Sequence, residues 1–156
     1  MTQSDRASAA LPSDPLALDN QICFALYSAS LAMTKAYKPF LDQLGLTYPQ
    51  YLVMLVLWQQ DDVLVKSIGE KLFLDSGTLT PLLKRLEAAA LIARTRDQAD
   101  ERQVRITLTR EGRALRKKAQ CIPQQILQAS GQPVEALLVL RRQLATLRDE
   151  LARNTE

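Results

Sequence analysis

One stretch of the sequence, from Lys66 to Thr109, constrains the fold more than any other part of the chain. Its periodicity predicts a helix, a short turn, a second helix, and then two basic strands joined by a polar hairpin. The whole chain is 47% hydrophobic but only 5% aromatic, which favours a helical protein rich in alanine and leucine. The predicted fold class is therefore mainly α with a small β-hairpin.

The second helix of this stretch has an apolar and a polar side. The apolar residues recur at helical spacing and predict a buried face, made of Leu79, Leu82, Leu83, Leu86 and Ala90. The polar side carries short hydroxyls followed by two bases, namely Ser76, Thr78, Thr80, Lys84 and Arg85. Short polar side chains can approach base edges in the major groove, while Lys and Arg bind phosphates. These five residues are predicted to contact DNA.

The start of this helix is predicted from its capping residues. Asp75 or Ser76 can cap it. Pro81 fits best if the helix effectively starts near Thr78, because a proline in the first turn loses no hydrogen bond.

The two segments after the helix, Ile92 to Arg96 and Val104 to Leu108, alternate in polarity like half-buried strands. The turn between them contains Arg102, and Asp100 is close enough in sequence to hold that arginine in position. An arginine at the tip of such a wing can enter the minor groove. An isolated charged hairpin is more simply a solvated surface. Its place directly after a helix-turn-helix favours a DNA-binding wing instead, with Arg94 and Arg96 as further contacts.

The segment DSGTLTPLLKRLE, from Asp75 to Glu87, followed by Asp100, Arg102 and the pair Leu108-Thr109, resembles the MarR family of dimeric winged-helix transcription regulators. The resemblance implies a homodimer that binds double-stranded DNA at a pseudo-palindromic operator. The two half-sites are then expected about one helical turn apart.

Charge and composition limit the alternatives. The net charge is only +3, so the argument for nucleic acid depends on the clustering of basic residues, at Lys84, Arg85, Arg94, Arg96, Arg102 and Arg105. The chain has no histidine and only two cysteines, which excludes the usual zinc spacings and the Ser-His-Asp or Cys-His catalytic arrangements. We expect no cofactor, no metal and no enzymatic activity. No apolar run is long enough to span a membrane, and the start lacks a signal-peptide core, so a cytoplasmic location is predicted.

The rest of the chain predicts helices on both sides of the DNA-binding region. The first helix can begin at Asp14-Pro15 or at Asp19 and continues to Leu44, and a second begins at Thr47 or Tyr48. Thr109 should cap a basic helix, Pro123 should interrupt it, and Pro133 suits the first position of the last helix. The predicted regions are a flexible tail at 1–14, a helical dimerisation region at 15–44 and 110–153, and a winged helix-turn-helix at 45–109.

The last helix repeats leucines at heptad spacing, at Leu137, Leu140, Leu144, Leu147 and Leu151. Such a seam can pack within the chain against the first helix, or against a second subunit. We favour dimerisation, because little of the chain is left to cover a terminal helix and such operators need two half-sites.

The segment from Leu18 to Ser30, LDNQICFALYSAS, resembles the OhrR branch of the MarR family, whose members sense organic hydroperoxides. The resemblance implies that Cys23 is the oxidised residue and that Tyr37 and Tyr48 support its thiolate. Tyr27 lies one helical turn beyond the cysteine. The resemblance further implies that Cys121 condenses with the oxidised Cys23 of the other subunit, although a small-molecule thiol could cap Cys23 instead.

Helix geometry adds a constraint. Tyr37 follows Cys23 by 14 residues, which along a straight helix is roughly 21 Å. The two side chains cannot touch within one chain, so the partner subunit would have to supply the tyrosines. The alternative is that Cys23 is a small buried hydrophobic residue with no redox role.

Two other functions are compatible with parts of the sequence. A MarR-type repressor could be switched by a phenolic or aromatic ligand in the dimer pocket, with Cys23 inert. A thiol peroxidase could use the same cysteine, but the basic winged helix argues against an enzyme.

Overall fold

The computed structural model describes residues 14–155. The predicted flexible tail, residues 1–14, therefore lies outside the described residues except for Asp14. The chain divides into two compact units, with the boundary between Lys35 and Ala36. Within residues 14–155, no helix combines the length and the apolar character that crossing a membrane requires.

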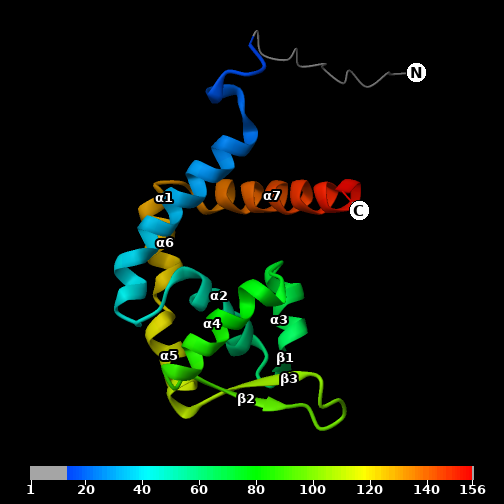
Figure 1. Cartoon of the computed structure of the whole chain (residues 1–156). Helices are drawn as coiled ribbons and strands as arrows, with labels where there is room; N and C mark the ends of the chain where they lie inside the picture. The colour runs from blue at the N-terminus through cyan, green and yellow to red at the C-terminus, as the bar shows by residue number, and fades with distance from the viewer. Residues whose placement is uncertain (1–13, 156) are drawn as a thin grey trace, which may run out of the picture. The chain divides into compact units, whose positions relative to one another are not determined.

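The fold is mainly helical with one small sheet, as predicted from the sequence (Figure 1). The helices, in chain order, are the 3-10 turn η1 (Leu18–Asn20), α1 (Ile22–Asp42), α2 (Tyr48–Gln59), α3 (Val65–Leu72), α4 (Ser76–Ala88), α5 (Arg110–Ala119), α6 (Ile122–Ser130) and α7 (Val134–Thr155). The strands are β1 (Val63–Leu64), β2 (Ile92–Arg96) and β3 (Val104–Leu108).

Helix α1 is shorter at both ends than the sequence predicted. The chain first forms the 3-10 turn η1, and Gln21 is extended, so neither predicted start is correct. Leu44 lies in the turn after the helix, where the backbone N–H of Leu46 donates to the carbonyl of Leu41 over 3.1 Å. Gly45 has a φ of +67°, a left-handed conformation that glycine adopts without strain and that ends the helical pattern.

Helix α2 begins where the sequence predicted. Thr47 and Gln50 form a capping box, in which each side chain accepts a hydrogen bond from the backbone N–H of the other residue. Pro49 lies in the first turn, where its missing N–H is no loss. The helix is buried on most of its sides by α3, α4 and α5, and its near-continuous hydrophobicity reflects this central position.

Helices α3 and α4 form the helix-turn-helix. Phe73 ends α3 in a left-handed conformation, and the turn lies so close to α3 that a β-carbon on Gly69 would stand 2.8 Å from the carbonyl oxygen of Leu74. Two details of α4 differ from the prediction. The helix starts at Ser76, so Pro81 lies in its second turn and removes one backbone hydrogen bond. It ends at Ala88, so Ala90, with a φ of +57°, is an exposed turn residue and is not on the buried face.

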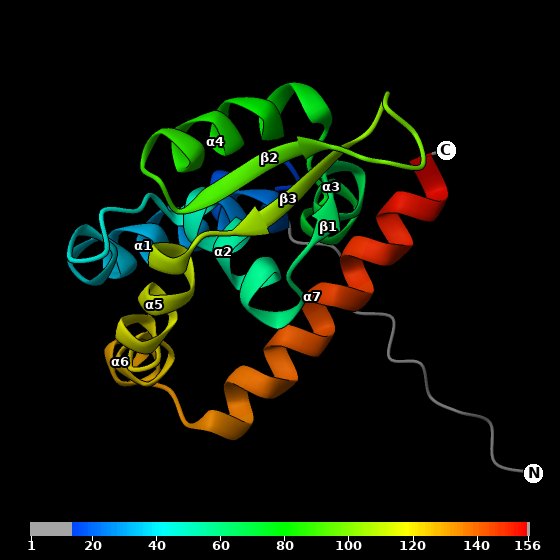
Figure 2. The same ribbon diagram turned by 90° about the horizontal axis from the view of Figure 1, so that it is seen from below.

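The two predicted strands are confirmed with their predicted ends, and β1 is an additional short strand. The sheet is antiparallel in the order β1-β3-β2, with Arg94 opposite Ile106 and Val63 also opposite Ile106 on the other side of β3. The β2–β3 hairpin and its connecting loop extend past the ends of α3 and α4 (Figure 2). The β2–β3 loop is therefore in the position of a wing.

The helices after the wing begin and end close to the positions predicted from the sequence. Thr109 caps α5 by accepting a hydrogen bond from the N–H of Gly112 over 3.0 Å. Pro123 lies in the first turn of α6, and the chain breaks between α5 and α6 as predicted. Pro133 immediately precedes α7 instead of occupying its first position. No residue of α7 is buried.

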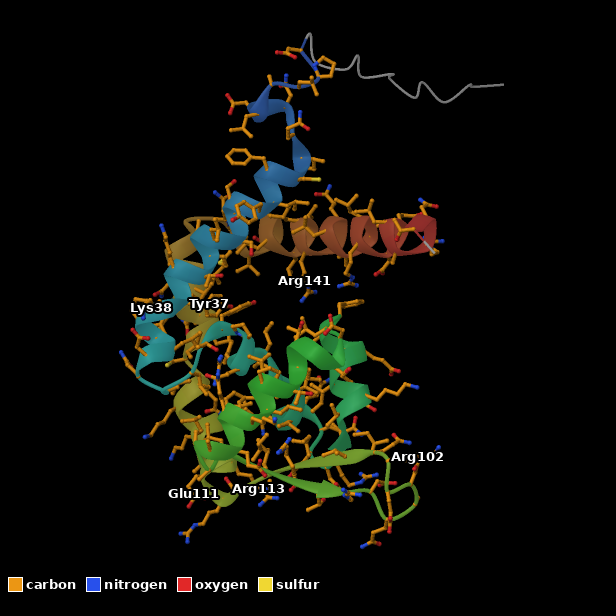
Figure 3. All side chains as sticks on the ribbon, in the orientation of Figure 1. Tyr37, Lys38, Arg102, Glu111, Arg113 and Arg141 are labelled. Atoms are coloured by element: carbon orange, nitrogen blue, oxygen red, sulfur yellow. The ribbon has the colours of Figure 1, made fainter. Side chains whose placement is uncertain are left out.

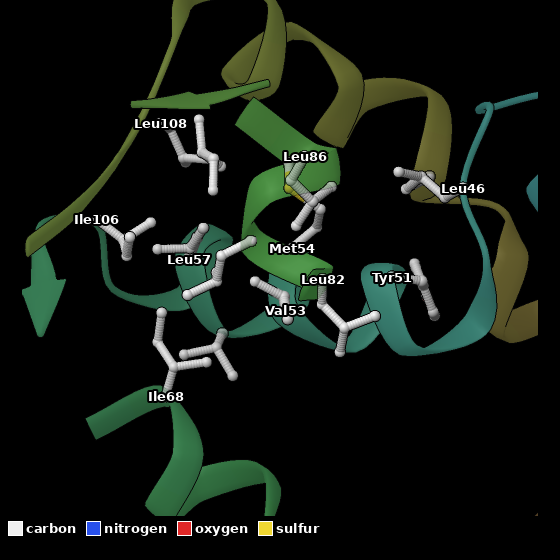
Figure 4. Close-up of a cluster of buried hydrophobic side chains, with 14 of the residues drawn as sticks. Leu46, Tyr51, Val53, Met54, Leu57, Ile68, Leu82, Leu86, Ile106 and Leu108 are labelled. Carbon is white, nitrogen blue, oxygen red and sulfur yellow. The ribbon is translucent and has the colours of Figure 1, made fainter. Parts of the chain in front are cut away.

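The core of the second unit lies between the helices and the sheet. Leu79, Leu83 and Leu86 of α4 are fully buried, as the sequence predicted, and Leu82 is almost so. Figure 4 shows how α2, α3, α4 and the sheet each contribute side chains, with Met54, Leu57, Ile68, Leu86 and Ile106 among those labelled. Within residues 14–155 no buried side-chain nitrogen or oxygen lacks a hydrogen-bond partner.

The junction of α5 with the sheet generates a prediction about stability. A β-carbon on Gly112 would lie 2.1 Å from the carbonyl oxygen of Leu91, and the chain's only tryptophan, Trp58, donates to the Gly112 carbonyl over 2.8 Å. The Leu91 carbonyl cannot move without displacing backbone, so Gly112→Ala should lower the free energy of unfolding by about 3 kcal/mol in urea titrations.

Gly77→Ala is the matched control, because its β-carbon would meet a side chain instead of backbone, the Asp75 oxygen that caps α4, at 3.2 Å. That variant should stay within about 1 kcal/mol of wild type, because a small shift of the capping oxygen offsets the higher helix propensity of alanine. Equal stabilities of the two variants would contradict the packing described at Gly112.

Candidate nucleic-acid interface and thiol site

Helix α4 presents a polar face opposite its buried leucines. Asp75 caps it by accepting a hydrogen bond from the N–H of Thr78 over 2.7 Å, and this bond holds the pKa of the Asp75 carboxyl below its usual value. Of the two caps considered from the sequence, Asp75 is the one used. Four of the five predicted contacts on this helix are exposed, namely Ser76, Thr78, Lys84 and Arg85.

Thr80 is the exception on this face. It is half-buried, and its hydroxyl donates to the carbonyl oxygen of Ser76 over 2.7 Å. Its proton is thus engaged within the helix. Toward a base edge, Thr80 can therefore offer only its lone pairs and its methyl group.

The basic residues of β2 are not equivalent. Arg94 forms an ion pair with Glu87 of α4, with Nε 2.8 Å from the carboxylate, and both side chains are partly buried. This pair ties the recognition helix to the wing and balances the charge of Arg94. Arg96, at the end of the strand, is exposed.

The wing tip has the geometry that the sequence predicted. The Arg102 side chain is 92% exposed and projects from the loop between β2 and β3 (Figure 3). Asp100 Oδ1 accepts hydrogen bonds from the backbone N–H of Arg102 over 3.1 Å and from its Nε over 3.2 Å. The pKa of Asp100 is lowered, chiefly by that backbone bond. The arginine is therefore oriented while its outer nitrogens stay available.

Four residues that matter to the wing were missed by the sequence analysis. Asp61, Asp62 and Asp97 were assigned no role from the sequence, and Arg105 was counted only as one more basic residue. The structure joins them at the base of the wing. The one signal in the sequence is an excess of acidic residues around a basic hairpin, which does not show which acidic residue pairs with which arginine.

The predicted thiol residues are divided between the two units. Cys23, in the first turn of α1, is an exposed free thiol, and Tyr27 one turn later is also exposed. The described part of its own chain therefore does not bury Cys23. Cys121 lies between α5 and α6, is exposed, and its Sγ is 3.6 Å from the Lys118 carbonyl oxygen.

Tyr37 and Tyr48 do lie together, in the second unit. Their ring centroids are 4.9 Å apart, and Tyr51, missed from the sequence, lies 5.8 Å from Tyr37 and 6.3 Å from Tyr48. Burial, with smaller effects of Tyr48 and Tyr51, raises the pKa of Tyr37 to about 12. Burial also raises the pKa of the other two phenols. All three are neutral at physiological pH and can act as hydrogen-bond donors.

Helix-turn-helix, oriented wing arginine and basic polar face together define a winged-helix, DNA-binding transcription regulator. A family model described as "Transcriptional regulator SarA/Rot" matches residues 35–119. The chain belongs to the MarR-like winged-helix family of transcriptional regulators. The resemblance found in the sequence is therefore confirmed.

Two curated relatives are similar over most of the chain. The organic hydroperoxide resistance transcriptional regulator of Bacillus subtilis (strain 168) is 52% identical over 138 residues, which cover 88% of this chain and 94% of that protein. The HTH-type transcriptional regulator TtmR of Methylorubrum extorquens (strain PA1) is also 52% identical over 138 residues, covering 88% of this chain and 71% of that protein.

Among solved structures, AbfR of Staphylococcus epidermidis is similar in fold and sequence. Overoxidized AbfR bound to DNA is 40% identical to this chain with a TM-score of 0.69, over 85% of this chain and 93% of that one. AbfR has also been solved in a reduced form bound to DNA and with its disulfide formed.

The wing geometry predicts the effect of removing its tip. Arg102→Ala should weaken operator binding by roughly tenfold, since one oriented groove contact contributes about 1–3 kcal/mol. It should also reduce the preference for A·T pairs where the wing enters the minor groove. Fluorescence anisotropy with a duplex selected by the wild-type protein measures both.

Glu101→Ala is the control, because Glu101 is an exposed neighbour in the same loop and has no attraction for DNA. It should bind as well as wild type or better. If both variants bind like wild type, the wing tip does not contact DNA.

Proposed function

We propose that this protein is a homodimeric repressor that releases its operator when an organic hydroperoxide oxidises Cys23. The observation that carries the proposal is an exposed free thiol at Cys23, in a chain 52% identical to a regulator of organic hydroperoxide resistance. The redox forms in which AbfR has been solved support the same kind of switch. A cytoplasmic location is part of the proposal, since a reducing compartment keeps cysteines as thiols.

The DNA contacts proposed are those on α4 and on the wing. Thr78, Lys84 and Arg85 are exposed on the recognition helix, and Arg102 is oriented at the wing tip. In this role Ser76 and Thr80 contribute small polar groups, Asp100 positions the arginine, and Arg96 adds positive charge beside the groove. Arg94, whose charge is balanced by Glu87, holds α4 beside the wing.

A homodimer is supported by the apolar side chains that the single chain leaves exposed. Large ones lie along α1 and along α7, namely Ile22, Phe24, Tyr27, Leu31, Met33, Val134, Leu138, Val139, Leu140, Leu144 and Leu151. Apolar surface on this scale is typical of an oligomer interface. The proposed dimerisation region is 15–44 with 110–153.

The tyrosine cluster supports a sensor site shared by two subunits. Neutral phenols can donate to a thiolate and favour its charged form. Tyr37 and Tyr48 are placed together, but Tyr37 is 14 residues from Cys23 along the sequence. In the proposed dimer the partner subunit supplies these phenols to Cys23. An apolar, phenol-lined site suits a bulky organic hydroperoxide better than hydrogen peroxide.

The proposed chemistry has two steps. The Cys23 thiolate attacks the terminal peroxide oxygen, the O–O bond breaks, and the alkoxide leaves and takes up a proton to become the alcohol. Cys23 is then a sulfenic acid, oxidised by two electrons. In the second step the thiol of Cys121 of the partner subunit attacks the sulfenic sulfur, an S–S bond forms, and water leaves.

Release of DNA is assigned to the disulfide. AbfR in its overoxidized form is bound to DNA, which favours the disulfide over further oxidation as the releasing event in this chain. A disulfide requires Cα atoms within roughly 7 Å. If the reduced dimer holds the cysteines farther apart, bond formation moves the helices that carry them, and the two recognition helices lose their operator spacing.

Cys23→Ser should bind the operator with wild-type affinity and should not respond to organic hydroperoxide, because a hydroxyl is neither a comparable nucleophile nor able to form the disulfide. Electrophoretic mobility shifts before and after stoichiometric cumene hydroperoxide measure this. A normal response of this variant would remove Cys23 from the switch.

The experiment that tests the whole proposal is a non-reducing gel of wild type and Cys121→Ser after the same treatment, with operator binding measured on the same samples. A covalent dimer in wild type only, with DNA released, is the expected result. If both proteins release DNA without a crosslink, the thiol that reacts with the Cys23 sulfenic acid is a small molecule and not Cys121. No change in either assay would leave a repressor gated by an aromatic ligand.

A further inference from the structure

The base of the wing is held by an arginine that the sequence analysis counts only as a member of the basic cluster. Arg105, on β3, donates from Nε to Asp97 Oδ1 over 2.9 Å. Its Nη1 donates to the carbonyl oxygen of Asp62 over 2.9 Å and to the Asp62 carboxylate over 3.2 Å. One guanidinium thus bridges the end of β2 to the turn that precedes β1.

Asp97 binds the backbone of the β2–β3 loop as well as Arg105. Its residue is only 9% exposed, and its Oδ2 accepts hydrogen bonds from the backbone N–H groups of Ala99 and Asp100, over 3.2 and 3.1 Å. Its own N–H donates to the carbonyl of Gln103 over 2.9 Å. Arg105, more than these backbone bonds, lowers the pKa of Asp97. The carboxylate therefore fixes both the loop and the arginine.

The turn before β1 contacts β3 at a second point, through Asp61. Asp61 Oδ1 accepts from the backbone N–H of Leu108 over 2.8 Å, and its Oδ2 pairs with Arg113 of α5 over 2.9 Å. Burial raises the pKa of Asp61, but these bonds leave it below its usual value. Asp62 has a φ of +58°, a strained conformation that persists where surrounding bonds require it.

The charges and exposures separate Arg105 from the DNA-facing arginines. Its side chain is 34% exposed, against 92% for Arg102, and it stands between two carboxylates, of Asp62 and Asp97. A guanidinium beside two carboxylates belongs to a cluster of net charge −1, which repels a phosphate.

We propose that Arg105, with Asp62 and Asp97, is a positioning residue that sets the direction of the wing and so the place where Arg102 meets DNA. It is not a phosphate ligand. The cluster of Arg105, Asp62 and Asp97, called the clamp below, connects the loop that carries Arg102 to β3 and to the turn before β1. Breaking the clamp therefore frees the wing without removing a DNA contact.

The test compares Arg105→Lys and Arg105→Ala with Arg96→Lys and Arg96→Ala, as full-length reduced protein. Affinity is measured by anisotropy over a range of salt concentrations, on a duplex selected by the wild-type protein from a randomised pool. A matched duplex has G·C pairs where the wing lies. Lysine keeps the charge, but its single ammonium cannot reproduce a planar guanidinium bridge between two carboxylates.

Both Arg105 variants should lose roughly tenfold in affinity, keep the wild-type salt slope, and discriminate less between the two duplexes. Arg96→Ala should lower the salt slope by about one, and Arg96→Lys should bind nearly as wild type. The ratio between duplexes is measured on one sample, so a loss of folded protein does not change it.

A wild-type affinity for Arg105→Lys, or a salt slope lowered by Arg105→Ala as much as by Arg96→Ala, would overturn the proposal. Asp97→Asn provides a second arm if the Arg105 variants do not fold. It should weaken binding, because the clamp loses an ionic partner. If Arg105 is a phosphate ligand, the same substitution releases its charge and strengthens binding, which would also overturn the proposal.

Discussion

Burial of α2 on most of its sides is the constraint on which the rest of this structure depends. Val53, Met54 and Leu57 are almost completely inaccessible, and α3, α4 and α5 all pack on this helix. Each fully buried side chain of this kind contributes about 1.5–3 kcal/mol by its removal from water. Helix α4 can present its polar face to DNA only because its leucines have this surface to pack against.

The same helix carries the two features that the proposed switch must connect. Tyr48 and Tyr51 lie in its first turns, and the Asp61-Asp62 turn follows directly after its last residues. Between them Trp58 donates to the Gly112 carbonyl, which ties α2 to the helix that follows the wing. A packed helix moves as a unit, so in the proposed switch a displacement at its tyrosine end would be carried to the turn that contacts β3.

The sequence was informative wherever a local rule applies. The caps at Thr47, Asp75 and Thr109, and the ends of β2 and β3, follow from capping chemistry and from alternation. The start of α1 was wrong because Asp14 precedes the 3-10 turn η1 and Asp19 lies inside it, while the extended residue Gln21 separates this turn from α1. Pro81 was misplaced because Asp75 caps the helix early enough to leave the proline in the second turn, a cost that packing of the leucines offsets.

The contacts at the tip of the wing could be predicted from the sequence, but those at its base could not. Asp100 and Arg102 are two residues apart, so their contact is local and could be inferred. Arg105 and Asp62 are 43 residues apart, and only the pairing of β1 with β3 brings them together. Since β1 has two residues and no alternation to detect, nothing in the sequence places Asp62 beside the wing. Tyr51 was overlooked for a similar reason, because an aromatic residue in a hydrophobic helix looks like core.

Counting basic residues therefore overestimates the surface that faces DNA. Arg94 is paired with Glu87, and Arg105 is enclosed by two carboxylates, although both belong to the basic cluster that first suggested nucleic acid. What remains for phosphates and bases is a smaller set on α4 and at the wing tip. With few contacts per subunit, operator affinity in the proposed dimer would depend strongly on two subunits binding together, and a change in the spacing between them would be enough to release DNA.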